Sequence, residues 1–139
     1  MTGLRVALGV ACITLASCGG GAAQAAPPAP AVEVEEEGDG RVTLVLTEDA
    51  AERLALETSL VPSAAPHGVP ESAVVYDAAG HAWIYLERAS LTYAREAVEV
   101  VEVAAGTAVL AHGPPANSRV VVVGAMELYG AETGIGGDH

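Results

Sequence analysis

Apolar and polar residues alternate along much of the second half of this chain with the two-residue period of a β-strand. The segments whose pattern or β-branched content predicts a strand are residues 42–46, 56–61, 69–76, 81–87, 93–103, 107–111 and 120–123. Asp77-Ala78-Ala79-Gly80 begins with Asp and ends with Gly, as type I turns prefer, and predicts a hairpin between its flanking strands. Strands at this spacing, without long helices between them, predict a mainly β fold, a small antiparallel barrel-like or curled sheet.

Two departures from simple alternation carry further predictions. The alternation of residues 93–103 has one break of register near Val100. Residues 120–123 are four consecutive valines, which predicts that they form the innermost strand. Gly124 then interrupts the run, and residues 125–129 are compatible with a single helical turn.

One short helix is predicted directly after the first strand. Thr47 is a suitable N-cap, and Glu48 and Asp49 follow in the first turn, where the helix dipole favours acidic side chains. Ala50 and Leu54 then share one apolar face.

The first 17 residues have the composition of a signal peptide. Arg5 precedes an apolar run that ends at Leu15 and is far shorter than the ~20 residues a membrane span requires. Leu15-Ala16-Ser17-Cys18, followed by three glycines, resembles the lipobox of bacterial lipoproteins. That resemblance implies cleavage before Cys18 and attachment of a lipid, such as a palmitate-bearing diacylglyceryl group, to its thiol. The alternative is an ordinary signal peptide cut near residues 23–26, which would discard Cys18.

Composition divides the rest of the chain into three parts. Residues 18–40 are rich in Ala, Pro and then Glu, a composition typical of a flexible, extended tether. Residues 41–130 contain all the predicted strands and form the β domain. Residues 131–139 are predicted to be a frayed tail.

The charge of the chain excludes one class of partner. Eighteen acidic and six basic residues give a net charge of −12, and every basic residue is Arg. A nucleic-acid partner requires a clustered basic face, which this sequence does not have. Both cysteines, Cys12 and Cys18, lie in or at the leader, so the mature domain is expected to have neither a disulfide nor thiol ligands.

An ordered series of short motifs in the β domain suggests a family. Residues 69–75 (VPESAVV), 77–85 (DAAGHAWIY), 95–100 (REAVEV) and 113–128 follow one another at a spacing that resembles the C-terminal, membrane-proximal domain of periplasmic adaptor subunits. These adaptors are the membrane fusion proteins of resistance-nodulation-division efflux pumps. Residues 46–58 separately resemble a segment near the start of heavy-metal-type adaptors.

The departures from the family indicate a truncated adaptor. Only residues 62–68 stand where a full adaptor has a β-barrel, a lipoyl-like domain and a helical hairpin, and residues 113–118 replace the usual Gly-Leu-x-x-Gly-Asp turn. The resemblance therefore implies a protein that is anchored by lipid to the extracytoplasmic face of the cell membrane. Such a protein would dock on an efflux transporter or permease without bridging two membranes.

The sequence contains no recognisable arrangement for catalysis, and we expect neither an enzyme nor a cofactor. The mature domain's serines lie in no nucleophile-elbow pattern. Glu96, Glu99 and Glu102 could be imagined as paired acid and base, but their spacing mixes strand faces and is more typical of a solvated surface. The histidines fall in predicted loops, at a turn edge or in the tail: His67, His81, His112 and His139.

A metal or small-ligand chaperone is the rival hypothesis. The candidate ligand types are His112, His139, Asp138, Met1 and Met126. They show no paired spacing, and Met1 would be lost with the leader, so no metal site is predicted.

Four aromatic residues lie on or near the predicted hairpin: Tyr76, Trp83, Tyr85 and Tyr93. They have two possible roles, as apolar anchors of a small core or as a partner-facing patch, because Trp and Tyr are favoured at interfaces.

Overall fold

The computed structural model describes residues 30–63 and 67–134. Within these ranges it contains ten strands, two α-helices and one 3-10 helix, so the predicted mainly β fold is confirmed. In chain order the elements are β1 (Val32–Glu36), β2 (Val42–Leu46), α1 (Glu48–Leu54), β3 (Glu57–Leu60), β4 (Gly68–Pro70), η1 (Glu71–Ala73), β5 (Val75–Tyr76), β6 (Ala82–Ala89), β7 (Thr92–Val98), β8 (Val100–Ala104), β9 (Thr107–Leu110), β10 (Arg119–Val123) and α2 (Ala125–Thr133).

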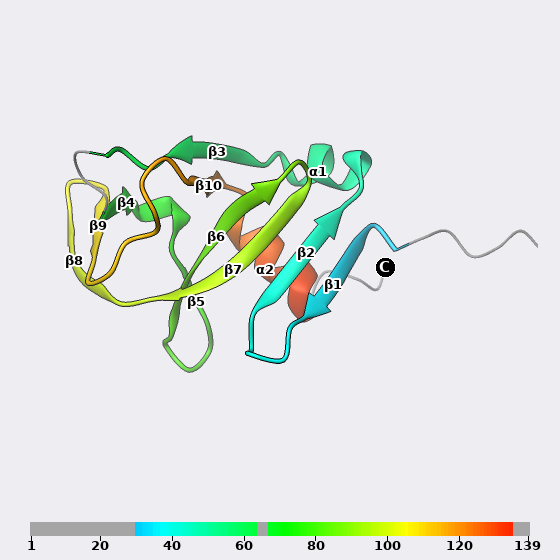
Figure 1. Cartoon of the computed structure of the whole chain (residues 1–139), viewed down its shortest axis with the longest axis horizontal. Helices are drawn as coiled ribbons and strands as arrows, with labels where there is room; N and C mark the ends of the chain where they lie inside the picture. The colour runs from blue at the N-terminus through cyan, green and yellow to red at the C-terminus, as the bar shows by residue number, and fades with distance from the viewer. Residues whose placement is uncertain (1–29, 64–66, 135–139) are drawn as a thin grey trace, which may run out of the picture.

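The strands form two antiparallel sheets (Figure 1). The large sheet has the order β1-β2-β7-β6-β10-β3, with β5 pairing on β6 beside β10. The small sheet has the order β4-β9-β8. In the described part of the chain the large sheet is open, because β1 and β3 end its order without pairing to each other. The described strands therefore form two antiparallel sheets and no closed barrel.

The strands β6 and β10 of the large sheet are buried on both faces. Successive residues of a strand point to opposite faces, and on β6 Tyr85 packs in a cluster with both helices whereas Ile84 and Leu86 pack in a second cluster with the small sheet. On β10, Val121 and Val120 divide in the same way. The helices thus cover one face of the large sheet, and the small sheet covers part of the other.

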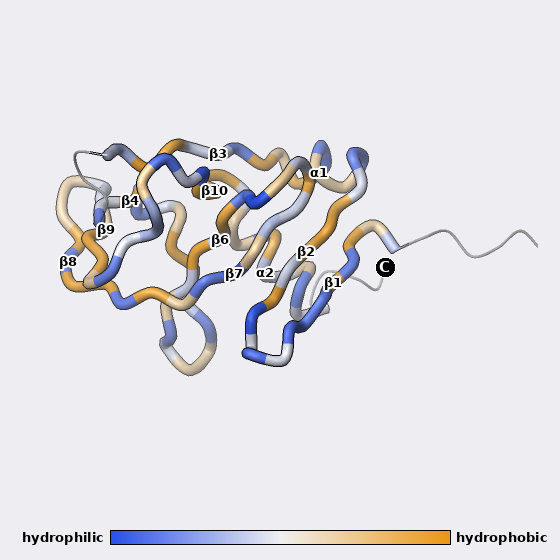
Figure 2. Tube along the Cα trace, viewed as in Figure 1, coloured by the Kyte–Doolittle hydropathy of each residue, from blue (hydrophilic) through white to orange (hydrophobic). Residues whose placement is uncertain are grey.

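The strand β1 corrects the predicted tether. Residues 18–40 were expected to be free of regular structure, but β1 pairs antiparallel with β2, with Val34 opposite Leu44. Its valines alternate with glutamates, so Val32 can pack against the core while the acidic side chains face solvent. Charged side chains on an edge strand discourage further pairing. Figure 2 shows the polar character of β1 and of the turn that follows it.

The predicted strand 69–76 is wrong as a single element. β4 pairs with β9 in the small sheet, whereas β5 pairs with β6 in the large sheet, and η1 lies between them. Pro70 lacks an amide hydrogen and ends β4. Only β5 therefore forms the predicted hairpin with β6, and the segment crosses from one sheet to the other.

The break of register predicted near Val100 is confirmed, and it marks a second crossing. β7 ends at Val98 in the large sheet and β8 begins at Val100 in the small sheet. Glu99 lies between them, and its carbonyl accepts a hydrogen bond from the Ala111 amide at 2.9 Å. One continuous run of alternating residues thus supplies a strand to each sheet.

The end of the described chain differs from its prediction in two respects. β10 is an interior strand, but it lies next to the edge strand β3, and β6 occupies the more central position. Helix α2 continues to Thr133, so residues 131–133 belong to a second helix and not to the tail. The first helix is as predicted, since the Thr47 hydroxyl accepts a hydrogen bond from the Ala50 amide. Neither helix in the described ranges is long and apolar enough to span a membrane.

Candidate functional site

The turn that joins β5 to β6 is organised by the carboxylate of Asp77. Its Oδ1 accepts hydrogen bonds from the amides of Ala79 and His81, both at 2.9 Å, and the Gly80 amide donates to the Asp77 carbonyl. The predicted turn is thereby confirmed. Asp77 Oδ2 accepts a bond from Trp83 Nε1 at 3.1 Å and lies 3.0 Å from His81 Nδ1. Partial burial opposes ionisation, but these bonds prevail and lower the pKa of Asp77 to about 2.

A second set of polar contacts links the ring of Trp83 to helix α2. The guanidinium of Arg95 lies over the indole, with Cζ 4.2 Å from the ring centroid, in a cation–π contact. Arg95 also forms a largely buried ion pair with Glu132 of α2. Glu132 accepts a hydrogen bond from the Tyr85 hydroxyl at 2.7 Å. Burial, and then the neighbouring Glu132 carboxylate, raise the pKa of Tyr85.

Sequence reasoning missed the role of Glu132, because it placed this residue in a frayed tail. The residue lies four positions after Leu128, a core residue of the same helix, so both fall on the side of α2 that faces the sheet. The four-residue spacing from Leu128 could have indicated that Glu132 faces the sheet, but only if the sequence had shown that α2 extends to Glu132. The sequence indicated only one helical turn, over residues 125–129, and so did not include Glu132 in the helix.

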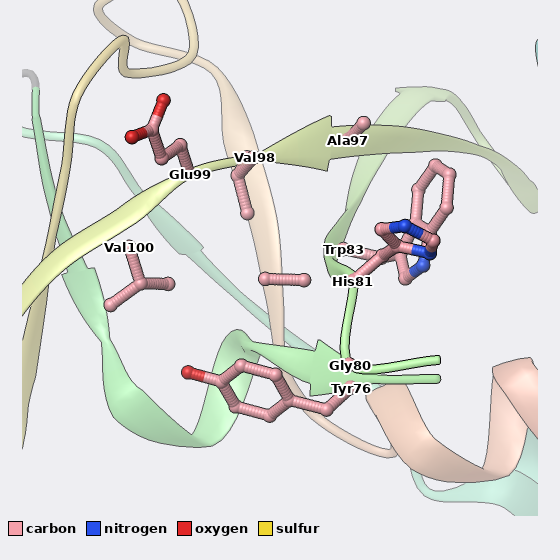
Figure 3. Close-up of a pocket in the computed structure, with 9 residues that line it drawn as sticks. Tyr76, Gly80, His81, Trp83, Ala97, Val98, Glu99 and Val100 are labelled. Carbon is pink, nitrogen blue, oxygen red and sulfur yellow. The ribbon is translucent and has the colours of Figure 1, made fainter. Parts of the chain in front are cut away.

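A pocket of about 600 Å³ opens beside the Asp77 turn (Figure 3). Its walls come from β5, from the beginning of β6 and from the crossing between β7 and β8. Val98 and Val100 point towards Tyr76 across the opening, and the carboxylate of Glu99 lies at the rim and points away from it. The two crossings between the sheets therefore create the hollow.

The four predicted aromatic residues separate into two pairs. Tyr85 is fully buried and Tyr93 is nearly so, and both belong to the core cluster that faces the helices. Burial, and then the charge of Glu87, raise the pKa of Tyr93. Tyr76 is 51% exposed, Trp83 is partly buried, and both line the pocket. Tyr85 and Tyr93 are thus core anchors, and only Tyr76 and Trp83 offer surface to a partner or ligand.

The edge of the small sheet is a second candidate surface. In the described part of the chain β8 pairs with β9 alone, so one side of its backbone has no partner strand. Val101 is 66% exposed and Val103 is 44% exposed. Glu99 and Glu102 are exposed beside them. This surface, the β8 edge, combines apolar side chains, free strand backbone and negative charge.

Within the described residues, the histidines and the three spaced glutamates are not brought together at one place. His81 is held by Asp77, and no serine or threonine hydroxyl in the described ranges is hydrogen-bonded to it. His67 Nδ1 accepts a bond from the Gly113 amide at 3.0 Å. Of the three spaced glutamates, Glu96 lies on the large sheet and Glu102 on the small one, so they are not paired.

The structure describes two of the five predicted metal-ligand types. Met126 is exposed on α2, and His112 is exposed in the loop after β9. Met1, Asp138 and His139 lie outside the described residues, as does the predicted lipidation site Cys18. No group of three or more His, Cys, Asp or Glu side chains that could hold a metal ion occurs within residues 30–63 and 67–134.

Comparison of the chain with protein-family models, with curated proteins and with solved structures found no match. The functional argument therefore starts from the two surfaces described above, the pocket and the β8 edge.

Proposed function

We propose that this chain is a lipid-anchored, extracytoplasmic interaction module that docks on a membrane transporter of the efflux type and carries out no chemistry itself. The observation that carries the proposal is the β8 edge, where strand backbone and apolar side chains are exposed together. The lipobox-like sequence before Cys18 supports the location, because a lipid on that cysteine would hold the domain at the membrane surface.

The β8 edge has the chemistry for strand addition. A partner strand that pairs with β8 would extend the small sheet by one strand, with main-chain hydrogen bonds supplying affinity. Val101 and Val103 would become covered by that strand or by the chain next to it. The carboxylates of Glu99 and Glu102 favour a partner segment with basic side chains, since complementary charge speeds encounter and sets specificity.

The other sheet edges are less suited to this role. β1 is guarded by Glu33, Glu35 and Glu36. β4 has three residues and ends in Pro70, which cannot donate a hydrogen bond. β3 exposes Leu60 at 54%, but its neighbours on that edge are Thr58 and Ser59. Among the edges in the described chain, β8 alone presents two exposed valines on one strand.

Photo-cross-linking from single positions tests the proposal in intact cells. A photoreactive residue replaces Val101 in the full chain, and the matched control replaces Leu60, an apolar residue of similar exposure on β3. We expect position 101 to cross-link to a polytopic transport protein, identified by mass spectrometry, and position 60 not to do so. The product should disappear in a Cys18→Ser background, because the domain would no longer be held at the membrane.

Two results would overturn the proposal. One is that position 101 gives no product with a transport protein. The other is that positions 101 and 60 give the same products in the same yield, because the contact would then not depend on the β8 edge.

A further inference from the structure

We propose that the pocket beside the Asp77 turn binds a small organic cation with an apolar body, of the quaternary ammonium or phosphonium class. This site adjoins the β8 edge at Glu99, but the exposed valines of that edge, Val101 and Val103, do not line it. The inference goes beyond the docking proposal and does not depend on it.

The pocket has the size and apolar lining of a small-molecule site. Its volume of about 600 Å³ falls within the ~300–1,000 Å³ typical of ligand pockets. Ala82 at the start of β6, together with Val98 and Val100 at the crossing between β7 and β8, supplies aliphatic surface to the lining. An apolar ligand body would therefore leave water for a largely hydrocarbon surface.

Two of the five Trp and Tyr side chains of the sequence line this pocket. The chain has one Trp, four Tyr and no Phe, and Trp83 and Tyr76 both contribute to the lining. The faces of such rings attract cations, and the attraction is strongest for Trp. Trp83 already makes one contact of this kind, with Arg95. That guanidinium lines the neighbouring pocket and not this one.

Trp83 is also held in place before any ligand arrives. Asp77 accepts a hydrogen bond from its indole nitrogen, and Arg95, fixed by Glu132, covers the ring. A side chain that is already ordered loses little conformational freedom on binding, which favours affinity.

The charges around the pocket favour a cation over an anion. Glu99 is the one carboxylate in the lining, where it lies at the rim and points away from the opening, and the lining contains no Arg. The neighbouring pocket differs, since three arginines line it together with two carboxylates: Arg41, Arg88, Arg95, Asp39 and Glu96. The net charge of −12 also draws cations towards the molecule.

Fluorescence of Trp83 provides a direct test, because it is the only tryptophan of the chain. The probes are tetraphenylphosphonium and tetraphenylborate, which match in size and shape and differ in the sign of their charge. With the full chain carrying Cys18→Ser, we expect a saturable change in fluorescence with the cation. Its dissociation constant should be at least about tenfold lower than that for the borate.

Three variants locate the site. Tyr76→Ala should weaken binding of the cation about tenfold, because an aromatic wall is lost. Glu99→Gln should weaken it about two- to fivefold, as expected for one partly solvated charge. Glu102→Gln, which makes the same charge change three residues along the chain on β8, should leave affinity unchanged. Circular dichroism establishes that each variant is folded.

The proposal is overturned if no saturable change occurs, or if the borate binds as tightly as the cation. It is also overturned if Glu99→Gln and Glu102→Gln have equal effects, since the overall charge would then account for binding. None of these results would bear on the β8 edge, so the two proposals can fail separately.

Discussion

The two sheets of this molecule are stabilised in different ways. The large sheet packs against both helices on one face and against the small sheet on the other, so β6 and β10 are buried from both sides. The small sheet contributes to one apolar cluster and leaves β8 open at its edge. The comparison indicates that the large sheet forms the stable core of the domain, here called the scaffold, and that the small sheet carries an exposed strand edge, here called the presented surface.

Ionic contacts follow the same division. The ion pairs of the described chain join residues of the large sheet, its turns and α2, as in Arg95–Glu132 and Arg119–Glu87. The small sheet is held by backbone pairing and by apolar residues such as Val69 and Leu110. A region with few buried contacts opens more readily than the core, which suits a sheet that is proposed to accept another strand.

The largest expected effect on stability comes from truncating a side chain in the core between α2 and the large sheet. Leu128→Ala removes a fully buried side chain that packs α2 on the large sheet. We expect the free energy of unfolding to fall by about 3 kcal/mol, within the usual range for a buried leucine. Chemical denaturation of the full chain carrying Cys18→Ser measures it.

The matched truncation on the small sheet is Val101→Ala. Because Val101 is 66% exposed, this change should alter the unfolding free energy by less than about 0.5 kcal/mol. Equal losses from the two truncations would contradict the distinction between scaffold and presented surface.

A pair of glycine substitutions gives the next largest effect. Gly124 has a φ of +84°, and a Cβ there would collide with the Leu56 side chain and lie 2.9 Å from the Leu54 carbonyl oxygen. Gly124→Ala should therefore destabilise the protein by about 2 kcal/mol, because the connection between β10 and α2 would have to shift. Gly130 lies within α2, and a Cβ there meets nothing within 4 Å. Gly130→Ala should stabilise it by about 0.5–1 kcal/mol.

Thermal unfolding of the two variants, compared with the parent chain, measures both effects. Opposite shifts of the melting temperature would support the conclusion that the position of α2 on the large sheet depends on the backbone geometry at Gly124, where the helix begins. Shifts in the same direction would show that α2 is not positioned in this way.

The sequence was most informative where local chemistry decides the structure. The Thr47 cap, the Asp77–Gly80 turn and the break near Val100 each depend on a few neighbouring residues, and each is found as predicted. The two sheets were not predictable from alternation alone, because period-two patterning specifies a strand and not its partners. For the same reason 69–76 was taken as one strand.

Long-range contacts account for the other errors. β1 is acidic enough to favour a solvated tether, and only its pairing with β2 makes it a strand. Of the four predicted aromatic residues, Tyr76 and Trp83 line the pocket whereas Tyr85 and Tyr93 are buried in the core, and the sequence did not distinguish the two pairs. The burial of Tyr85 and Tyr93 depends on α2, whose length the sequence did not reveal.

The smallest expected effect is a dependence on pH at the margin of the large sheet. The pKa of Asp77 is about 2 in the folded protein and 3.8 in its unperturbed state. Because the folded value is the lower one, ionised Asp77 stabilises the fold fully above 3.8, and that contribution is lost as the pH falls towards 2. The stability difference between the parent chain and Asp77→Asn should therefore be constant above this window and shrink within it, as followed by denaturation monitored through the fluorescence of Trp83.

A stability difference that persists unchanged at pH 2 would show that the bonds to Ala79, His81 and Trp83 do not depend on the charge of the Asp77 carboxylate. A decline within the window would instead show that the charge of Asp77, already among the ionic contacts of the large sheet, contributes to the stability of that sheet.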